Sequence, residues 1–530
     1  MLPAKHTLAL ALLGMGGTIA ACQTAQAFSF NAGDLVVSSS LYPTGPGAVV
    51  PVIVPGVTQL PGGGTAIADG TYPDVFKNDT VDASFGVTTQ LFLNQLTLSS
   101  GNHVATADGS AYNVTAATGI VNSFPSKSEG ALNLSSDGHS LTLVDYATTV
   151  NQLDVSNSNT PGVTEPGNPV TTTPTARAIV DIGFNGTAKV IDTNAYAGNN
   201  GRAAVKIGGE YFLTGNAGNG TGSAATTAVG GVQVIDPATA TTTAGTLNTT
   251  KVGGFDISKI ANPNAGQTGN YTADKTAKDD NYRGLTVFNN TLYVSKGSGG
   301  NGIDTVYQVG TAGGAGAINA ANAASQAITI LPGLPNTLAV GGTTKNQGSP
   351  APTHFPFGLY FANATTLYVA DEGDGTTATA GTNVHAGLEK WIFSAGSWKE
   401  AYTLQNGLGL GIAYSVATPT GQTAYPSVTT DGLRNLTGEV NVDGTVSLFA
   451  VTSTISASGD QGADPNRLVE IDDLLAATTL PGSESFTVLE TAAYGQVLRG
   501  VSFAPVPEPA SLTLLGLAAA AMGWVRRKRV

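Results

Sequence analysis

The sequence contains almost no cysteine. Its single cysteine, Cys22, lies near the start of a chain of 530 residues. The rest of the chain therefore has no disulfide, no thiolate ligand for a metal and no thiol nucleophile. Its stability must come from the burial of apolar side chains. Hydrophobic residues make up 41% of the chain, which is enough for a sizeable core.

Charged residues are also scarce, at 11% of the chain against about 25% in an ordinary soluble protein. Five of the 23 positive side chains and one of the 36 acidic ones lie in the terminal segments, which leaves 18 and 35 in the body, a net charge of −17. Such a body repels nucleic acid and anionic lipid, and it suits cations, neutral glycans or simple solubility. The 69 glycines favour many short strands joined by tight turns.

Familiar catalytic motifs are missing from the sequence. It has no G-x-S-x-G elbow, no P-loop and no H-E-x-x-H. The glycine-rich run Gly407–Gly411 lacks the spacing of a dinucleotide-binding loop. The four histidines of the body are far apart in sequence, and we expect isolated surface or turn histidines. They are His103, His139, His354 and His385.

The N-terminus is typical of a secretory signal peptide. A short basic start precedes the apolar stretch Leu8–Ala21, which is too short to span a membrane comfortably. Ala25 and Ala27 frame a small-x-small cleavage site. Residues 1–27 are therefore predicted to direct the chain to the Sec translocon and then to be removed by signal peptidase. The alternative is a lipobox ending at Cys22, which would then carry the lipid.

The C-terminus combines three parts in a fixed order. The rigid tripeptide Pro507-Glu508-Pro509 comes first, and the apolar stretch Leu512–Val525 follows. A basic stop closes the chain, formed by Arg526, Arg527, Lys528 and Arg529. The apolar stretch is short for a permanent span, as expected of a segment that is cut away. A plain tail anchor is the alternative.

This arrangement resembles the PEP-CTERM sorting signal of Gram-negative bacteria, over residues 506–530. In that family an exosortase, a membrane cysteine protease, processes the tail, often in species that form exopolysaccharide or biofilm. The resemblance implies transient anchorage in the inner membrane by the C-terminal helix. It then implies release to the medium or display on the cell surface, with exosortase as a partner.

Between the two ends, a pattern of two apolar runs around a short turn recurs. Clear cases are the turns at Gly208-Gly209, Asn289-Asn290 and Asp443-Gly444. Period-2 apolar runs around such dipeptides indicate β-hairpins. Two further strand-like runs follow several of the hairpins, and four strands per unit are typical of a propeller blade.

The repeats start at residues 129, 202, 283, 357, 434 and 499, and they predict an all-β, single propeller with six blades over residues 28–505. Asp34–Ser38 has no strand before it to pair with, and Arg499–Phe503 has none after it. Pairing these two strands closes the ring and leaves no long exposed edge. Seven blades remain an alternative, because residues 42–85 and 407–425 are not well explained, and a β-solenoid is the structural rival. The body is loosely similar to secreted bacterial propellers, including the esterase-like domain related to phytases.

Four of the six arginines of the body fall at the start of the first strand of separate repeats. They are Arg202, Arg283, Arg434 and Arg499. The first strand of a blade lines the central channel, so these guanidinium groups could form a site for an anion or an acidic glycan. The alternative is that each arginine pairs with a neighbouring blade. Glu129 and Phe357 occupy the same position in the other two repeats.

The densest acidic cluster contains Asp371, Glu372 and Asp374. Ca²⁺ prefers several oxygen ligands from one tight loop, so these residues are a candidate calcium site. A solvated turn is the alternative, and no other cofactor is expected.

Together these features predict an exported, non-enzymatic propeller that is displayed on the cell surface or released from it, and the PEP-CTERM resemblance implies an association with extracellular polysaccharide. The alternative is a propeller hydrolase of phosphoesterase or lactonase type, with a divalent cation at the channel mouth. A third alternative is a purely structural coat or matrix protein without a ligand.

Overall fold

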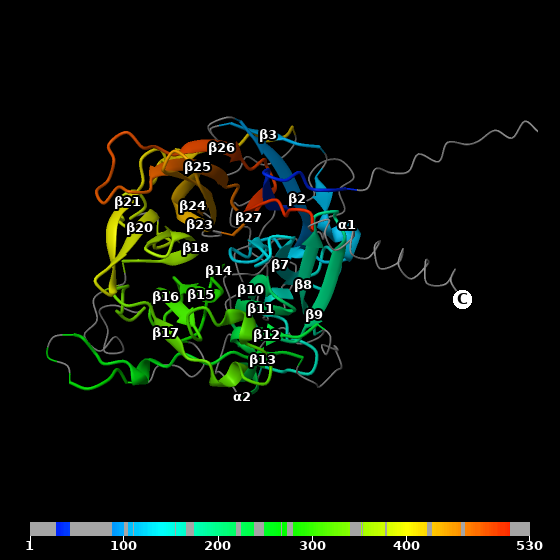
Figure 1. The fold of residues 1–530 in the computed structure, drawn as a ribbon. Helices are drawn as coiled ribbons and strands as arrows, with labels where there is room; N and C mark the ends of the chain where they lie inside the picture. The colour runs from blue at the N-terminus through cyan, green and yellow to red at the C-terminus, as the bar shows by residue number, and fades with distance from the viewer. Residues whose placement is uncertain are drawn as a thin grey trace, which may run out of the picture.

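The computed structural model describes residues 28–42, 87–99, 104–109, 111–153, 155–165, 174–218, 224–237, 248–264, 266, 268–272, 279–339, 351, 353–376, 379–420, 427–456 and 462–508. Within these residues the strands form six antiparallel sheets arranged as the blades of one propeller (Figure 1). The prediction of an all-β, six-bladed propeller is confirmed. The predicted signal helix and C-terminal helix lie outside the described residues.

The blades are numbered along the chain, and their strands are given from the channel outward. Blade 1 contains β27 (Gln496–Phe503), β1 (Leu35–Leu41), β2 (Thr88–Leu98) and β3 (Ala105–Ala107), with β4 (Tyr112–Asn113) and β5 (Asn122–Ser123) also paired to β2. Blade 2 contains β6 (Asn133–Leu134), β7 (Ser140–Tyr146), β8 (Arg177–Gly183) and β9 (Ala188–Thr193). Blade 3 contains β10 (Gly201–Ile207), β11 (Glu210–Gly215), β12 (Gly231–Ile235) and β13 (Thr250–Lys251).

The remaining three blades follow the same order. Blade 4 contains β14 (Leu285–Phe288), β15 (Thr291–Lys296), β16 (Thr305–Val309) and β17 (Ile328–Ile330). Blade 5 contains β18 (Pro356–Asn363), β19 (Thr366–Asp371), β20 (Gly387–Ser394) and β21 (Ser397–Leu404). Blade 6 contains β23 (Val428–Val440), β24 (Thr445–Ser456), β25 (Arg467–Leu474) and β26 (Thr487–Thr491), and the short β22 (Ala413–Tyr414) pairs with β23.

The helices among the described residues are few and short. They are α1 (Val114–Thr118), α2 (Ala224–Val229) and the 3₁₀ turns Val155–Asn157, Ile257–Lys259, Ala315–Ala317 and Ala323–Ser325. In the part of the chain that the structure describes, no helix has the length and apolar character needed to cross a bilayer.

Local sequence explains the hairpins inside each blade. Asn289 and Asn290 join β14 to β15, and both have a positive φ, of 46° and 53°. Asparagine tolerates this left-handed backbone, which a two-residue hairpin turn of the right twist requires. The register follows at once, with Phe288 opposite Thr291.

The two ends of the body share blade 1 and close the ring. Strand β1 pairs with β2 on one side and with β27 on the other, so that Val37 lies opposite both Asn94 and Val501. Figure 1 shows the red β27 beside the blue β1 and β2. The predicted closure by N- and C-terminal strands is confirmed.

Glycines let neighbouring first strands approach closely around the channel. A Cβ atom on Gly284 would lie 2.1 Å from the carbonyl oxygen of Phe357 in the next blade. A Cβ on Gly500 would lie 2.4 Å from the backbone nitrogen of Leu132. In both blades the preceding residue is an arginine, so the repeated Arg-Gly pair places a guanidinium beside each close approach.

Candidate functional site

The central channel is lined by the first strands of all six blades. A cavity of about 310 Å³ lies along it, bordered by backbone and side chains from β6, β10, β14, β18, β23 and β27. Phe357, one of the two residues in place of an arginine, is buried and lines this cavity. The cavity wall combines apolar side chains with polar ones, among them Asn133, Asn435 and Thr437.

Arg202 and Arg283 lie at the start of their first strands, as predicted, whereas Arg434 and Arg499 lie within β23 and β27, because these strands begin several residues earlier than expected. Each of the four arginines contacts another part of the ring. Arg202 donates to the carbonyl of Tyr282 in blade 4 at 2.7 Å and to the side chain of Asn281. Arg499 donates to Ser40 Oγ at 2.8 Å, to the carbonyl of Gly462 at 3.1 Å, and to further backbone carbonyls. These two guanidinium groups therefore link adjacent blades.

The other two arginines gather around one carboxylate. Arg434 Nε lies 3.2 Å from Glu372 Oε2, and Lys127 Nζ lies 3.4 Å from the same oxygen. Arg283 donates to Ser128 Oγ at 2.9 Å and to Ser298. Burial acts to raise the pKa of Glu372, but the positive charges of Lys127, Arg434 and Arg283 outweigh it and lower the pKa. Burial also lowers the pKa of Lys127, to about 8.

This channel-mouth cluster borders a cavity of about 280 Å³. Carboxylates balance most of its positive charge: Asp304 pairs with Lys296 at 2.6 Å, and Asp431 lies on the same wall. Burial raises the pKa of Asp431 to about 7, so this carboxyl is partly protonated near neutral pH. The cavity therefore offers both hydrogen-bond donors and acceptors with little net charge.

Glu129 occupies the arginine position in blade 2 and is almost fully buried. It accepts a hydrogen bond from the hydroxyl of Tyr146. Burial raises its pKa to about 7, against the opposing influence of that hydrogen bond and of Arg499 and Arg177.

The three carboxylates of the predicted calcium site have separate partners. Asp371 is fully buried and accepts from the backbone nitrogens of Phe355 at 2.5 Å and Gly373 at 2.8 Å. Glu372 faces Lys127 and Arg434, as described above. Asp374 accepts from the side chains of the following threonines. The structure does not bring the three to one point, and calcium binding there stays a prediction.

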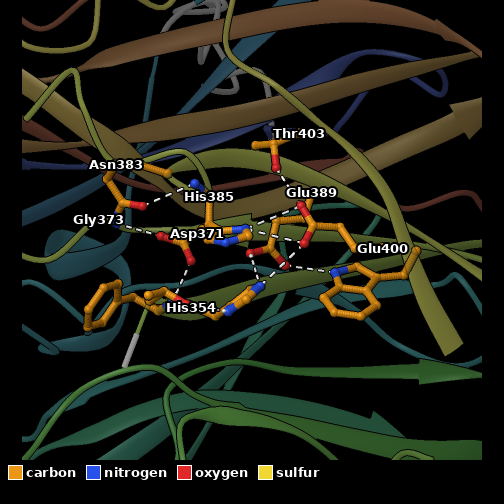
Figure 2. A network of polar contacts seen from close by, with 12 residues as sticks. His354, Asp371, Gly373, Asn383, His385, Glu389, Glu400 and Thr403 are labelled. Carbon is orange, nitrogen blue, oxygen red and sulfur yellow. Dashed lines mark hydrogen bonds and ion pairs between the residues drawn. The ribbon is translucent and has the colours of Figure 1, made fainter. Parts of the chain in front are cut away.

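Two histidines, by contrast, come together in blade 5 (Figure 2). The ring centroids of His354 and His385 are 3.8 Å apart, so the expectation of isolated histidines is wrong for this pair. Both rings face Glu400: His354 Nε2 is 3.4 Å and His385 Nδ1 is 3.2 Å from its Oε2. Glu389 Oε1 lies 3.8 Å from His354 Nε2. Among the described residues, His354, His385 and Glu400 are the group that could share a metal ion.

A β-bulge explains how the two glutamates meet. Glu389 on β20 lies opposite Thr403 on β21, and Trp391 lies opposite Glu400, with the register shifting between Lys390 and Trp391. Residues 400 and 403 would face opposite sides of a regular strand, because side chains alternate. The extra residue of the bulge turns both toward the face that carries Glu389 and Trp391.

Neighbouring groups hold this histidine–glutamate cluster in place. Thr403 Oγ1 donates to Glu400 Oε1 at 2.8 Å, and Thr353 Oγ1 lies 3.1 Å from His354 Nδ1. Burial acts to raise the pKa of Glu400, but hydrogen bonds from the two histidines and Thr403 lower it overall. Burial raises the pKa of Glu389 well above its usual range, and the charges of Asp371 and Glu400 add to the effect.

The other histidine that the structure describes, His139, lies in the turn between β6 and β7 and contacts the residue before the Pro-Glu-Pro motif. Its Nδ1 is 2.9 Å from the carbonyl oxygen of Val506, and the Val506 nitrogen donates to the carbonyl of Gly138. Pro507 and Glu508 follow and are exposed. The other predicted processing and anchoring residues lie outside the described residues, as does His103; they are Cys22, Ala25, Ala27, Pro509, Arg526, Arg527, Lys528 and Arg529.

Comparison with known proteins identifies the tail. Residues 505–529 match the PEP-CTERM protein-sorting motif. The motif marks the protein as exported through the Sec pathway and sorted by exosortase to the cell surface or the extracellular space. No curated protein matches the chain.

Similarity to solved structures is low. The ectodomain of the parainfluenza virus 5 hemagglutinin-neuraminidase shares 10% identity over 71% of this chain and 74% of its own, with a TM-score of 0.31. The N-terminal domain of Nup159 shares 8% identity over 73% and 78%, with a TM-score of 0.26. An ACO/RPE65 chimera shares 8% over 80% of this chain, which spans 60% of that protein, with a TM-score of 0.22. Similarity of this size says nothing about activity.

Proposed function

We propose that this exported, exosortase-sorted propeller is a non-enzymatic binding or matrix protein that holds extracellular polysaccharide. Signal peptidase would free its N-terminus, and the apolar C-terminal segment would keep it in the inner membrane until exosortase cuts near Pro507-Glu508-Pro509. The folded body would then work on the cell surface or beyond it. The sorting motif at residues 505–529 supports this route.

The channel-mouth cavity is the observation that carries the binding function. Sugar hydroxyls both donate and accept hydrogen bonds, and the cavity offers donors from Lys127 and Arg434 beside acceptors on Glu372 and Asp304. Its volume of about 280 Å³ suits one or two sugar units rather than a large cofactor. The near balance of charge fits neutral or acidic glycans, whereas the body's net charge of −17 opposes nucleic acid.

Lys127 provides the sharpest test, because its side chain is 29% exposed and borders the cavity. We expect the secreted protein to co-sediment with purified extracellular polysaccharide of the producing strain. Lys127→Ala should weaken that binding at least about tenfold, the usual loss with one charged hydrogen bond. The exposed Lys399 on β21 supplies the matched control, Lys399→Ala, with unchanged binding. Absence of binding, or equal binding by both variants, would refute the proposal.

A hydrolase is the second candidate, and the histidine–glutamate cluster of blade 5 is the observation that favours it. Hydrolysis of phosphate esters or lactones by such a site would need a divalent cation to activate water. Cation-dependent turnover that disappears in Glu400→Gln would establish an enzyme and displace the binding proposal. Turnover that persists in Glu400→Gln would exclude this cluster as its source.

A further inference from the structure

We propose that His354, His385, Glu400 and Glu389 form a binding site for one divalent transition-metal ion of the zinc class. This inference goes beyond the proposed function and does not depend on it, because an ion can serve stability, ligand binding or chemistry. It rests on the donor set, the distances between donors, and one buried carboxylate oxygen.

The chemistry of the donors comes first. Two imidazole nitrogens and carboxylate oxygens are typical ligands of Zn²⁺ and its neighbours, whereas Ca²⁺ and Mg²⁺ prefer oxygen alone. Both histidines direct a ring nitrogen at the same oxygen of Glu400. With ring centroids 3.8 Å apart, the two imidazoles are close enough for each to direct one nitrogen at the same ion.

The distances between donors also fit. Ligand atoms 2.0–2.1 Å from a tetrahedral zinc ion lie about 3.4 Å from one another. His385 Nδ1 and His354 Nε2 are 3.2 Å and 3.4 Å from Glu400 Oε2, and His354 Nε2 is 3.8 Å from Glu389 Oε1. An ion among these atoms would therefore require only small side-chain rotations.

Glu389 supplies the independent observation. Its side chain is 2% exposed, and its Oε1 accepts no hydrogen bond from any described residue. Its other oxygen accepts from Trp391 Nε1 at 2.7 Å, which fixes the carboxylate and points Oε1 toward His354 (Figure 2). A buried carboxylate oxygen without a donor is costly, and a metal ion would supply the missing partner.

The surroundings have the features of a built metal site. Thr403 and Thr353 contact Glu400 and the far nitrogen of His354, as outer groups do when they orient ligands. Glu389 and Glu400 sit on paired strands rather than on loops. His354, His385 and Glu400 keep 16%, 22% and 23% of their side chains exposed, so an ion can enter from solvent and retain a water ligand.

The test uses the purified exported protein, freed of metal with a chelator, and Zn²⁺ alone as the probe. We expect isothermal titration calorimetry to show one Zn²⁺ per chain, with Ca²⁺ and Mg²⁺ at least about 100-fold weaker. Co²⁺ in place of Zn²⁺ should give visible absorption bands. His385→Ala, and the nearly isosteric Glu389→Gln, should each weaken Zn²⁺ binding at least about tenfold while circular dichroism stays unchanged.

His139→Ala is the matched control, because His139 is a partly exposed histidine on a different blade. It should bind Zn²⁺ as the wild type does. Absence of stoichiometric Zn²⁺ binding would overturn the site. Equal affinity in Glu389→Gln, His385→Ala and His139→Ala would overturn it as well, since the bound ion would then lie elsewhere.

Discussion

Lys390 and Asp473 form an ion pair that joins blade 5 to blade 6 without any contact with solvent. The Lys390 Nζ–Asp473 Oδ2 distance is 2.7 Å, and both side chains are 0% exposed. Lys390 also donates to the carbonyl of Leu474 at 2.8 Å. The hydroxyls of Tyr368 and Tyr402 donate to Asp473 at 2.5 Å and 2.6 Å. The pair is therefore bonded to other groups of the protein, most of them buried, and not to solvent.

Removal of the lysine charge should be costly. Lys390→Met keeps most of the aliphatic volume but leaves the Asp473 carboxylate buried without a counter-charge, which typically costs about 3–5 kcal/mol of unfolding free energy. Asp473→Asn should destabilise the wild type as well, because it leaves the Lys390 ammonium buried without a counter-charge. In the Lys390→Met background the same change removes the stranded charge and keeps an acceptor for the tyrosines. There it should restore about 1–3 kcal/mol.

Urea unfolding followed by tryptophan fluorescence measures these changes, because Trp391 lies next to Lys390 in the chain. Lys399→Met, on the exposed face of β21, is the control and should change stability by less than about 0.5 kcal/mol. A cost below about 1 kcal/mol for Lys390→Met would refute the reasoning. So would an Asp473→Asn effect with the same sign in both backgrounds, since the two charges would then be uncoupled.

Three further outcomes are expected. Because the folded-state pKa of Glu129 is raised from 4.5 to about 7, its contribution to stability should be complete below pH 4.5 and lost as the pH rises to 7, by at most about 3 kcal/mol. The urea concentration at the unfolding midpoint should therefore fall over this pH range, and it should fall less in Glu129→Gln; a midpoint that rises would contradict the prediction. Gly500→Ala should lower the unfolding free energy by about 1–3 kcal/mol, because the new Cβ meets the Leu132 backbone, whereas Gly482→Ala, where no atom lies near, should leave it almost unchanged. Equal thermal midpoints for the two variants would disprove the close approach. Mass spectrometry of the exported protein should show a start at Phe28 and loss of the apolar tail; a lipidated N-terminus or an intact tail would contradict it.

The blades could be predicted from sequence because their signals are local. The Asn289-Asn290 turn between two apolar runs specifies a hairpin whatever the rest of the chain does. Ring closure could also be predicted, because Asp34–Ser38 and Arg499–Phe503 are strands without neighbours in sequence. Both inferences need only strand periodicity and the rule that edges are covered.

The histidine–glutamate cluster could not be predicted in the same way. His354 and Glu400 are 46 residues apart, and they meet only because the hairpin β20–β21 folds back against the segment before β18. The bulge after Lys390 also reverses the side on which Glu400 would lie in a regular strand. One signal was available: His354 and His385 each stand two residues before a strand of the same blade, β18 and β20. The partners of the arginines likewise depend on how one blade sits against the next.

The contacts of Val506 with the turn of blade 2 would set the length of the tether if the proposed C-terminal anchor holds the folded body at the membrane. Val506 is bonded to Gly138, and its carbonyl oxygen lies 2.9 Å from His139 Nδ1. Only five residues lie between Val506 and Leu512, where the apolar segment starts, and this stretch can span at most about 20 Å. Before the cut, the propeller would therefore be held close to the bilayer with the β6–β7 turn toward it. The protease would have to reach its site in the narrow space between the folded body and the bilayer. Cleavage would free the body from the membrane and end its fixed orientation.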